Sequence, residues 1–546
     1  MAAITPNSDL YLLKCPLEID NTHQLNFANK NAQANYFLGL PKKLNIEDDT
    51  YTYIRHDSVI RVNAHIDTLL EYNYVMYRND AYSNKWFYAF ITDMEYLNDG
   101  CTAVTIKGDS WQNWQFDITF KRSFVEREHV NNDTFGIHTV PEDIQTGEYI
   151  CNKMSSFEYT SRDYMICMQV TELPNDYDAS SVTHKYYNRI INGCWVLGFP
   201  YNNTGVDRLN SVTRWYDANT KADAIVAMFI APKAVISWNE VSVPLSGGDY
   251  VSINFPVDSN SATLMQRSVF ENINTLDGYS PKNAKCYCYP YNFLTMSNNN
   301  GEVYTYNFED FDGSASGGTN IYPTFEAYGT LSQGCSIKAI PINYKKGSTN
   351  IVSQWDCGVN GGKFPIVSWT SDYYLNWQAQ NREYLVTSAG LDIASNIVGT
   401  LGAKALNPLD LVGSALNAFS TINEAVHQDK VAQAVPNQAK GNTATGDLNF
   451  SFGVDRFTFK QMCCRNEFIR IVDDYFSAFG YKVITYKVPN ITGRANWNFV
   501  KLSEANIIGD IPQQDMDEIK GYFLKGITIW HNPNTFLDYT QNNNIV

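Results

Sequence analysis

The sequence predicts a mainly β protein that ends in an α+β module and is interrupted by one long apolar helical loop. Charged residues make up 18% of the chain and aromatic residues 14%, and tyrosine and asparagine are abundant. This composition is typical of extracellular or virion β-proteins. Short runs of alternating apolar residues are separated by turn signals such as Asn98-Asp99-Gly100. Helical spacing of apolar residues becomes clear only in the apolar segment and after residue 447.

A chain of 546 residues is long enough for about two to four domains. We predict an N-terminal β-rich domain over residues 1–135 and an inserted β-rich region of one or two modules over 136–350. Residues 351–446 hold an aromatic lead-in and the apolar loop, and 447–546 form the C-terminal α+β part.

The N-terminal domain is predicted to be built from strands. Alternation and strand-forming residues mark 58–66, 72–77, 86–96, 102–107 and 116–120, and the second and third of these form a hairpin. In the inserted region, strands are predicted over 164–170, 194–199, 224–230 and 303–308. Turn signals separate these strands, among them Asn202-Asn203.

The apolar segment runs from Thr387 to Asn423. Its only charged residues are Asp392, Lys404 and Asp410, and Asn407-Pro408 divides it into two helical runs. Each run is too short to cross a membrane, which takes about 20 apolar residues. Two interpretations stay open. Composition alone favours a helical hairpin buried against its own domain or a neighbouring subunit, and the alternative is an insertion sheltered in one state and released into a bilayer in another.

In the C-terminal part, segments with the apolar spacing of helices alternate with segments typical of strands. A helix over 468–479 is predicted to stop at Gly480, before a strand over 481–488. Asp510 is predicted to cap a second helix with Pro512 in its first turn, and Gly526 to end that helix before a strand over 527–530.

Charge and cysteine content narrow the function classes. A net charge of −16 argues against a surface that grips nucleic acid, although a channel that DNA passes without sticking would suit it. The eleven cysteines are irregularly spaced and include no CxxC pair, so we expect reduced thiols in a protein folded in a cytoplasm. The N-terminal residues show no signal peptide.

No catalytic, metal-binding or cofactor motif is present. HExxH, GxSxG, GxxxxGK[ST] and GxGxxG are all missing, so we predict no catalytic residue, no metal ligand and no cofactor. The paired carboxylates Glu126/Glu128 and Asp473/Asp474 are interpreted as solvated surface groups. A wall hydrolase whose acids converge only in space is the enzymatic alternative.

Several aromatic patterns resemble a known family. Residues 74–98 read YVMYRNDAYSNKWFYAFITDMEYLN, and with 111–130, 476–490 and 509–531 they resemble the distal tail-knob protein of small podoviruses that infect Gram-positive bacteria. The order of the parts agrees as well. The resemblance covers the two ends of the chain and not its middle.

The resemblance implies a virion protein at the distal end of the tail, made in the bacterial cytoplasm. Its N- and C-terminal parts would form a hexameric tube of β-barrels, thickened by the middle domains. The expected partners are other copies of the chain, the proximal tail tube and collar proteins, the host cytoplasmic membrane, and viral DNA passing non-specifically through the lumen. The apolar loops would plug this lumen and later form a conduit through the membrane.

Carried onto this sequence, the resemblance assigns plugging and membrane penetration to the apolar residues of the loop: Leu391, Ile393, Ile397, Val398, Leu401, Leu406, Leu409, Leu411, Val412, Leu416, Phe419 and Ile422. Its charged residues would then have to face a wet lumen or the membrane interface. The alternative function is receptor binding, in which aromatic and Asn/Asp side chains of 136–350 recognise cell-wall glycopolymers.

Overall fold

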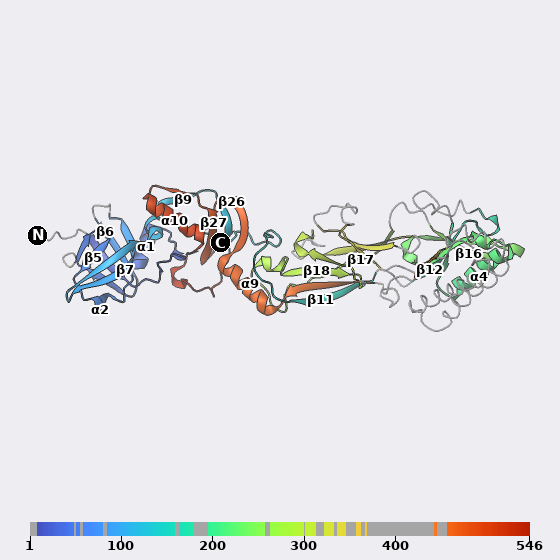
Figure 1. Cartoon of the computed structure of the whole chain (residues 1–546), viewed down its shortest axis with the longest axis horizontal. Coiled ribbons are helices and arrows are strands. Elements are labelled where there is room, and N and C mark those ends of the chain that lie inside the picture. Colours follow the sequence, from blue (N-terminus) through green and yellow to red (C-terminus); the bar gives the residue numbers. More distant parts are fainter. Residues whose placement is uncertain are drawn as a thin grey trace, which may run out of the picture. The chain divides into compact units, whose positions relative to one another are not determined.

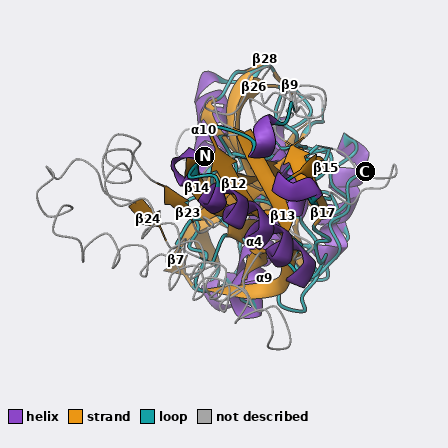
Figure 2. Cartoon of the chain, turned by 90° about the vertical axis from the view of Figure 1, so that its right-hand side faces the viewer, coloured by secondary structure: helices purple, strands orange, loops and turns teal. Residues whose placement is uncertain are grey.

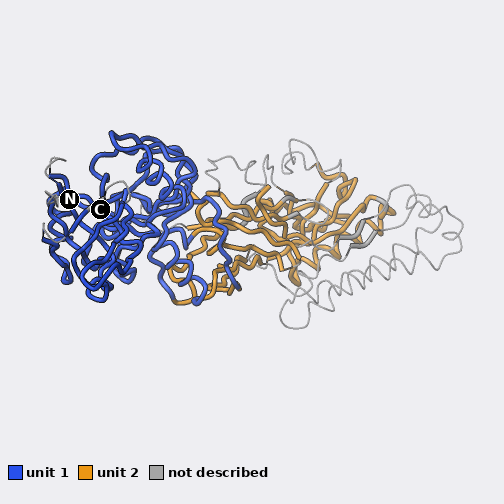
Figure 3. The backbone as a smooth tube through the Cα atoms, turned by 60° about the vertical axis from the view of Figure 1, so that its left-hand side comes forward, with its two compact units in different colours: residues 1–147, 279–287, 466–546 blue, residues 148–278, 288–465 orange. Residues whose placement is uncertain are grey.

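The structure is a computed structural model in which the chain divides into two compact units (Figure 3). The first unit comprises residues 1–147, 279–287 and 466–546, and the second comprises 148–278 and 288–465. The chain therefore passes between the units four times. The residues that the structure describes are 8–47, 51–54, 58–79, 84–158, 163–178, 195–256, 263–299, 301–312, 322–331, 336–344, 356–361, 366–368, 442–444 and 456–546.

The fold is mainly β, as composition predicts, and includes a nearly closed barrel sheet. A seven-stranded sheet with the order β3-β1-β6-β7-β8-β5-β4 opens the first unit (Figure 1). One face buries Leu12 and Val75, while the other buries Tyr74 and Tyr88 against Phe37 of α1 (Lys30–Leu38). Burial on both faces explains why these strands are so apolar. The strands are β1 (Ser8–Leu13), β3 (Lys43–Ile46), β4 (Tyr51–Ile54), β5 (Val59–Val62), β6 (Tyr74–Asn79), β7 (Trp86–Asn98) and β8 (Cys101–Gly108).

The hairpin predicted in this sheet is confirmed, since β6 and β7 pair antiparallel with Tyr74 opposite Phe90. The strand predicted over 58–66 is too long. It ends at Val62, and the helix α2 (Ile66–Leu69) begins after His65, whose side chain accepts a hydrogen bond from the Asp67 backbone N–H. The last predicted strand shrinks to β9 (Ile118–Phe120), because residues 115–117 form the turn that follows α3 (Ser110–Trp114), with the Asp117 N–H donating to the Trp114 carbonyl.

A second sheet in the first unit joins strands from distant parts of the sequence. Its order is β2-β29-β27-β10-β26, and β2 (His23–Leu25) runs parallel to β29 (Ile527–Trp530). Val500 and Ile529 of this sheet pack against Phe523 of α10 (Gln513–Lys525). The remaining strands are β10 (Ser123–Glu128), β26 (Tyr481–Lys487) and β27 (Trp497–Glu504), and β28 (Ile507–Gly509) pairs separately with β9.

The C-terminal helices follow the prediction except at one end. Helix α9 (Asn466–Phe479) ends at Gly480 as predicted, with φ of 64°. A Cβ at Gly480 would lie 2.2 Å from the Glu128 carbonyl oxygen, so only glycine fits. The predicted cap at Asp510 is wrong, because α10 begins after Pro512. A residue directly before proline is pushed out of the helical region, which keeps 511 from joining the helix. Gly526 ends α10 as predicted.

In the second unit, two four-stranded sheets pack face to face. Their orders are β11-β25-β18-β19 and β17-β20-β21-β22, and the Phe459 ring lies 4.7 Å from that of Phe325 and 6.0 Å from that of Phe270. The strands are β11 (Tyr149–Glu158), β17 (Thr263–Val269), β18 (Asn292–Ser297), β19 (Val303–Asn307), β20 (Thr324–Thr330), β21 (Ser336–Pro341), β22 (Val359–Asn360) and β25 (Arg456–Cys464).

A further seven-stranded sheet has the order β15-β16-β13-β12-β14-β23-β24, and Figure 2 shows α4 (Asn203–Ala218) lying along its strands. The turn predicted at Asn202-Asn203 is instead the start of α4, where the Asn202 side chain accepts a hydrogen bond from the Gly205 N–H at 2.8 Å. The four strands predicted in the inserted region are confirmed within two residues. The strands of this sheet are β12 (Tyr164–Val170), β13 (Trp195–Pro200), β14 (Ile225–Pro232), β15 (Trp238–Pro244), β16 (Tyr250–Pro256), β23 (Ile366–Ser368) and β24 (Asn442–Ala444).

Candidate functional site

The apolar loop lies outside the described residues, but the structure describes the strands on either side of it. β23 and β24 pair antiparallel, with Ile366 opposite Ala444 and Ser368 opposite Asn442. β23 also pairs with β14, and Figure 2 shows β23 and β24 side by side. The two ends of residues 369–441 are therefore adjacent strands at one edge of the seven-stranded sheet. We name these two paired strands the loop base.

The sheet that carries the loop base has an apolar centre. All seven residues of β12 are buried, and so are the last six of β14. Helix α4 packs on this sheet and buries Val206, Leu209 and Val212. The buried part of β14 includes Ala227, Met228 and Phe229, which pair with β23, so the loop base is joined directly to this apolar centre.

The residues assigned to plugging and membrane penetration cannot be placed in the fold. Leu391, Ile393, Ile397, Val398, Leu401, Leu406, Leu409, Leu411, Val412, Leu416, Phe419 and Ile422 all lie outside the described residues. Asp392, Lys404 and Asp410 do so too, and the predicted roles stay predictions. Among the helices that the structure does describe, none is long and apolar enough to cross a bilayer.

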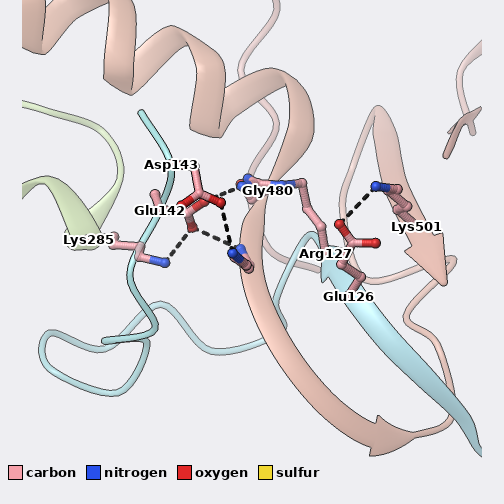
Figure 4. Close-up of polar contacts among 8 residues, drawn as sticks. Glu126, Arg127, Glu142, Asp143, Lys285, Gly480 and Lys501 are labelled. Carbon is pink, nitrogen blue, oxygen red and sulfur yellow. Dashed lines mark hydrogen bonds and ion pairs between the residues drawn. The ribbon is translucent and has the colours of Figure 1, made fainter. Parts of the chain in front are cut away.

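In the first unit, Glu142 is the centre of a buried ionic cluster (Figure 4). Its side chain is fully buried and accepts from the Lys285 ammonium at 2.5 Å, the Lys482 backbone N–H at 2.9 Å and the Arg127 guanidinium. Arg127 also donates to the Gly480 carbonyl at 2.7 Å. The side chain of Lys285 is 3% exposed and that of Arg127 is 12% exposed. Glu142 therefore joins β10, β26 and the segment 279–287.

Asp473 of α9 is a second buried carboxylate that binds the segment 279–287. It accepts from the Tyr279 hydroxyl at 2.7 Å, the Lys282 backbone N–H at 2.9 Å and the Asn283 side-chain amide at 2.8 Å. Burial and the Asp473 carboxylate together raise the pKa of Tyr279. Asp473 is fully buried. We name Glu142, Asp473 and the donors around them the carboxylate clamp.

The clamp corrects part of the sequence analysis. Asp473 and Glu128 are buried, so the interpretation of their pairs as solvated surface groups is wrong for these two members. Glu128 accepts from the Asn490 N–H at 2.9 Å and pairs with Lys487. Their partners are distant in sequence. Helical spacing does place Asp473 on the apolar face with Ile469 and Phe476, and Asp474 off it, so this signal could have distinguished the two.

Two further buried ionisable groups, His129 and Asp109, also have fixed hydrogen-bond partners. Burial lowers the pKa of His129 to about 3, and its ring lies between the Ser477 carbonyl and the Phe499 N–H. Burial raises the pKa of Asp109 to about 6, although Gln112, Tyr74 and Gln24 donate hydrogen bonds to it. These arrangements suit holding the fold together rather than moving protons.

In the described part of the chain, the cysteines and the possible metal ligands also give no sign of a reactive or metal-binding site. The nine cysteines there are free, and burial raises the pKa of the Cys15 thiol to about 12 and of the Cys463 thiol to about 11. Such thiols are unreactive. Over the same residues, no group of three or more His, Cys, Asp or Glu side chains could hold a metal ion.

Comparison with known protein families identifies the class of protein as a component of phage tails. A family model described as the N-terminus of the caudoviral major tail protein matches residues 7–121. The model of the C-terminal domain of tail knob protein gp9 of Bacillus phage phi29 matches residues 257–544. The chain belongs to this tail knob family.

Similar proteins extend the match to nearly the whole chain. Tail knob protein gp9 of Bacillus phage B103 is 26% identical over 584 residues, covering 95% of each chain. Its counterpart in Bacillus phage phi29 is 23% identical and covers 96% of each. The solved structure of the bacteriophage C1 tail knob protein gp12 covers 99% of this chain at 14% identity, with a TM-score of 0.62, and so has the same fold. The chain is thus a structural component of the virion tail.

Proposed function

We propose that six copies of the chain form a tube at the distal end of the tail, and that the apolar loop closes this tube before infection. The loop then leaves the lumen and enters the host cytoplasmic membrane, so that viral DNA can pass. The proximal end of the tube would contact the tail tube and collar proteins. The net charge of −16 supports a lumen along which DNA slides without binding.

The observation that carries this proposal is the loop base. Because β23 and β24 pair with each other, the apolar segment leaves the fold and returns to it at one sheet edge. A segment joined in this way can move out of a lumen while the sheet keeps its pairing.

Membrane entry is compatible with the chemistry of the loop. Six helical hairpins can satisfy their own backbone hydrogen bonds and present apolar side chains to lipid. Glycine, alanine and serine are frequent between Thr387 and Asn423, which allows close helix packing. Before infection, burial in a tube would keep this apolar surface away from water.

The test is dye release from liposomes by the full chain and by a variant in which 388–440 is replaced with a short Gly/Ser linker. We expect release by the full chain at neutral or mildly acidic pH and none by the linker variant. Light scattering measures the mass of the assembly that each protein forms. Both should assemble equally, with six copies expected. The matched control is the double substitution Ile397→Asp with Leu416→Asp, which keeps the loop length and should abolish release while leaving assembly intact.

Release that persists in the linker variant would overturn the membrane role of the loop. If neither protein releases dye while both assemble, the loop is a plug or a packing hairpin. If the double variant does not assemble, Ile397 and Leu416 belong to a core.

Receptor binding remains the second candidate, and exposed aromatic residues in the second unit support it. Tyr250 is 69% exposed and Tyr289 is 51% exposed, so both can contact a ligand. Pull-down with purified cell wall should then be saturable and should weaken when both are replaced by serine. Unchanged binding by that variant would count against this site.

A further inference from the structure

A cleft of about 1020 Å³ opens in the first unit. Its walls come from α9, from the segment 279–287 and from residues 539–545, and all of its lining residues belong to this unit. The volume is at the upper end of what small-molecule sites usually enclose. None of the roles proposed above uses this cleft.

The walls of the cleft are fixed in advance by hydrogen bonds. Asp133 accepts from the Tyr481 hydroxyl at 2.6 Å and from the Ala284 N–H at 3.1 Å. Arg494 donates to the Val130 carbonyl at 3.0 Å and to the Asn543 carbonyl at 3.2 Å. A ligand would therefore meet a site that needs little ordering, which lowers the entropic cost of binding.

The mouth of the cleft offers both donors and acceptors to solvent. Lys282 and Asp474 are exposed there, and no hydrogen bond or ion pair within the described residues engages their side chains. The exposed residues Asn542 and Asn544 add amides. The charges in the lining balance, Lys282 and Arg494 against Asp133 and Asp474, which gives no net attraction for phosphate or for a divalent cation. Apolar side chains that could anchor a peptide are few in the lining.

Tyr539 supplies a rigid aromatic surface in the same cleft. Its ring stands nearly perpendicular to those of Trp497 and Trp530, with ring centres 5.1 Å and 5.2 Å away, and its hydroxyl lies 3.0 Å from Nε2 of His23. The residue is still 36% exposed. A ring held in this way can stack against an apolar face without losing conformational freedom on binding.

We propose that this cleft binds a neutral saccharide, a short chain of hexose or N-acetylhexosamine units. Such a ligand has hydroxyl groups that both donate and accept hydrogen bonds, together with C–H faces that stack on an aromatic ring. It therefore matches the amides, the balanced charges and Tyr539. This inference does not depend on the tube, the plug or the membrane role of the loop.

The test is calorimetric titration of the full chain with two probes, N-acetylglucosamine trimer and maltotriose, which separate the two sugar types. We expect a Kd near the millimolar range for at least one probe. The double variant Lys282→Ala with Asp474→Ala should weaken this binding at least about tenfold. The matched control is Lys525→Ala with Asp510→Ala, which removes the same charges outside the cleft and should bind as the unmodified chain does.

A second variant separates binding from folding. Tyr539→Phe keeps the ring and loses only the hydroxyl contacts with His23 and Thr528, so it should bind within about twofold of the unmodified chain. No heat change with either neutral probe up to saturating concentration would overturn the proposal. Equal binding by the Lys282/Asp474 double variant would place the sugar elsewhere, and tighter binding of a sulfated or phosphorylated saccharide would overturn the neutral class.

Discussion

The segment 279–287 and the loop base are both short pieces of chain that return to a fold after a long interval, but they are held by different forces. In the first unit, the buried carboxylates Glu142 and Asp473 bind 279–287 through ionic and hydrogen bonds. In the second unit, β23 and β24 are held by backbone pairing at the edge of a sheet. A buried carboxylate tolerates little change, because a partner left alone is a buried charge. The edge strand β24 pairs on one side only, so its opening breaks fewer hydrogen bonds than the opening of an inner strand. Buried charge therefore holds one return point, and backbone hydrogen bonds hold the other.

The largest effect should come from breaking the carboxylate clamp. Glu142→Ala leaves Lys285 and Arg127 buried without their counter-charge, so we expect the first unit to lose about 3–5 kcal/mol of unfolding free energy. Hydrogen exchange of peptides from β10 and β26 measures this loss. The matched control is Asp143→Ala, whose side chain is 93% exposed and should change stability by less than about 0.5 kcal/mol.

Replacing the whole cluster sharpens the same test. A triple variant with leucine or methionine at positions 127, 142 and 285 removes all three charges together, and it should be more stable than Glu142→Ala alone. Equal losses in Glu142→Ala and Asp143→Ala would show that the cluster does not hold the segment 279–287.

A smaller effect is expected from Asp109, and it should depend on pH. Burial raises the pKa of Asp109 from 3.8 to about 6, so the fold favours the protonated form. The contribution of Asp109 to stability is therefore full below pH 4 and is lost as the pH rises through 6. Asp109→Asn removes this dependence while keeping a good cap for α3. The difference in unfolding free energy between Asp109→Asn and the unmodified chain should shift in favour of the variant by on the order of 2 kcal/mol from pH 4 to pH 7.

Melting curves of both proteins between pH 4 and pH 7.5 measure this change. Tyr74→Phe should move the midpoint of the dependence to higher pH, because the Tyr74 hydroxyl lowers the pKa of Asp109. Parallel curves for the unmodified chain and Asp109→Asn would contradict the assignment.

The smallest effect is expected at the loop base. Val367→Pro removes a backbone N–H from β23, which lies between β14 and β24. We expect the free energy of local opening at the loop base to fall by about 1 kcal/mol. Limited proteolysis should cut near β23 sooner while the melting temperature of the second unit stays the same. Val367→Ala keeps the N–H and should be cut at the unmodified rate. A large loss of melting temperature in the proline variant would mean that the base is part of the core.

Patterns of neighbouring residues in the sequence predicted much of the fold but little of the carboxylate clamp. The strand 164–170 and the end of α9 at Gly480 were predictable, because burial on both faces and a positive φ leave clear marks on the sequence. Helix α4 was missed even though Val206, Leu209 and Val212 recur at helical spacing, since Asn202-Asn203 reads equally well as a turn. Glu142 could not be singled out, because its partner Lys285 lies 143 positions away.

The pairing of β2 with β29 and of β10 with β26 has a consequence for the time course of synthesis. The strands β2 and β10 leave the ribosome long before β26, and at about 5–20 residues per second the wait between β10 and β26 lasts roughly 20–70 s. Most of the second unit is made during that interval, and β25, which pairs with both β11 and β18, comes at its end. Meanwhile the five-stranded sheet stays incomplete, with β10 unpaired on both sides. We therefore expect nascent chains stalled between residues 300 and 480 to be the form most prone to aggregate and most in need of chaperones.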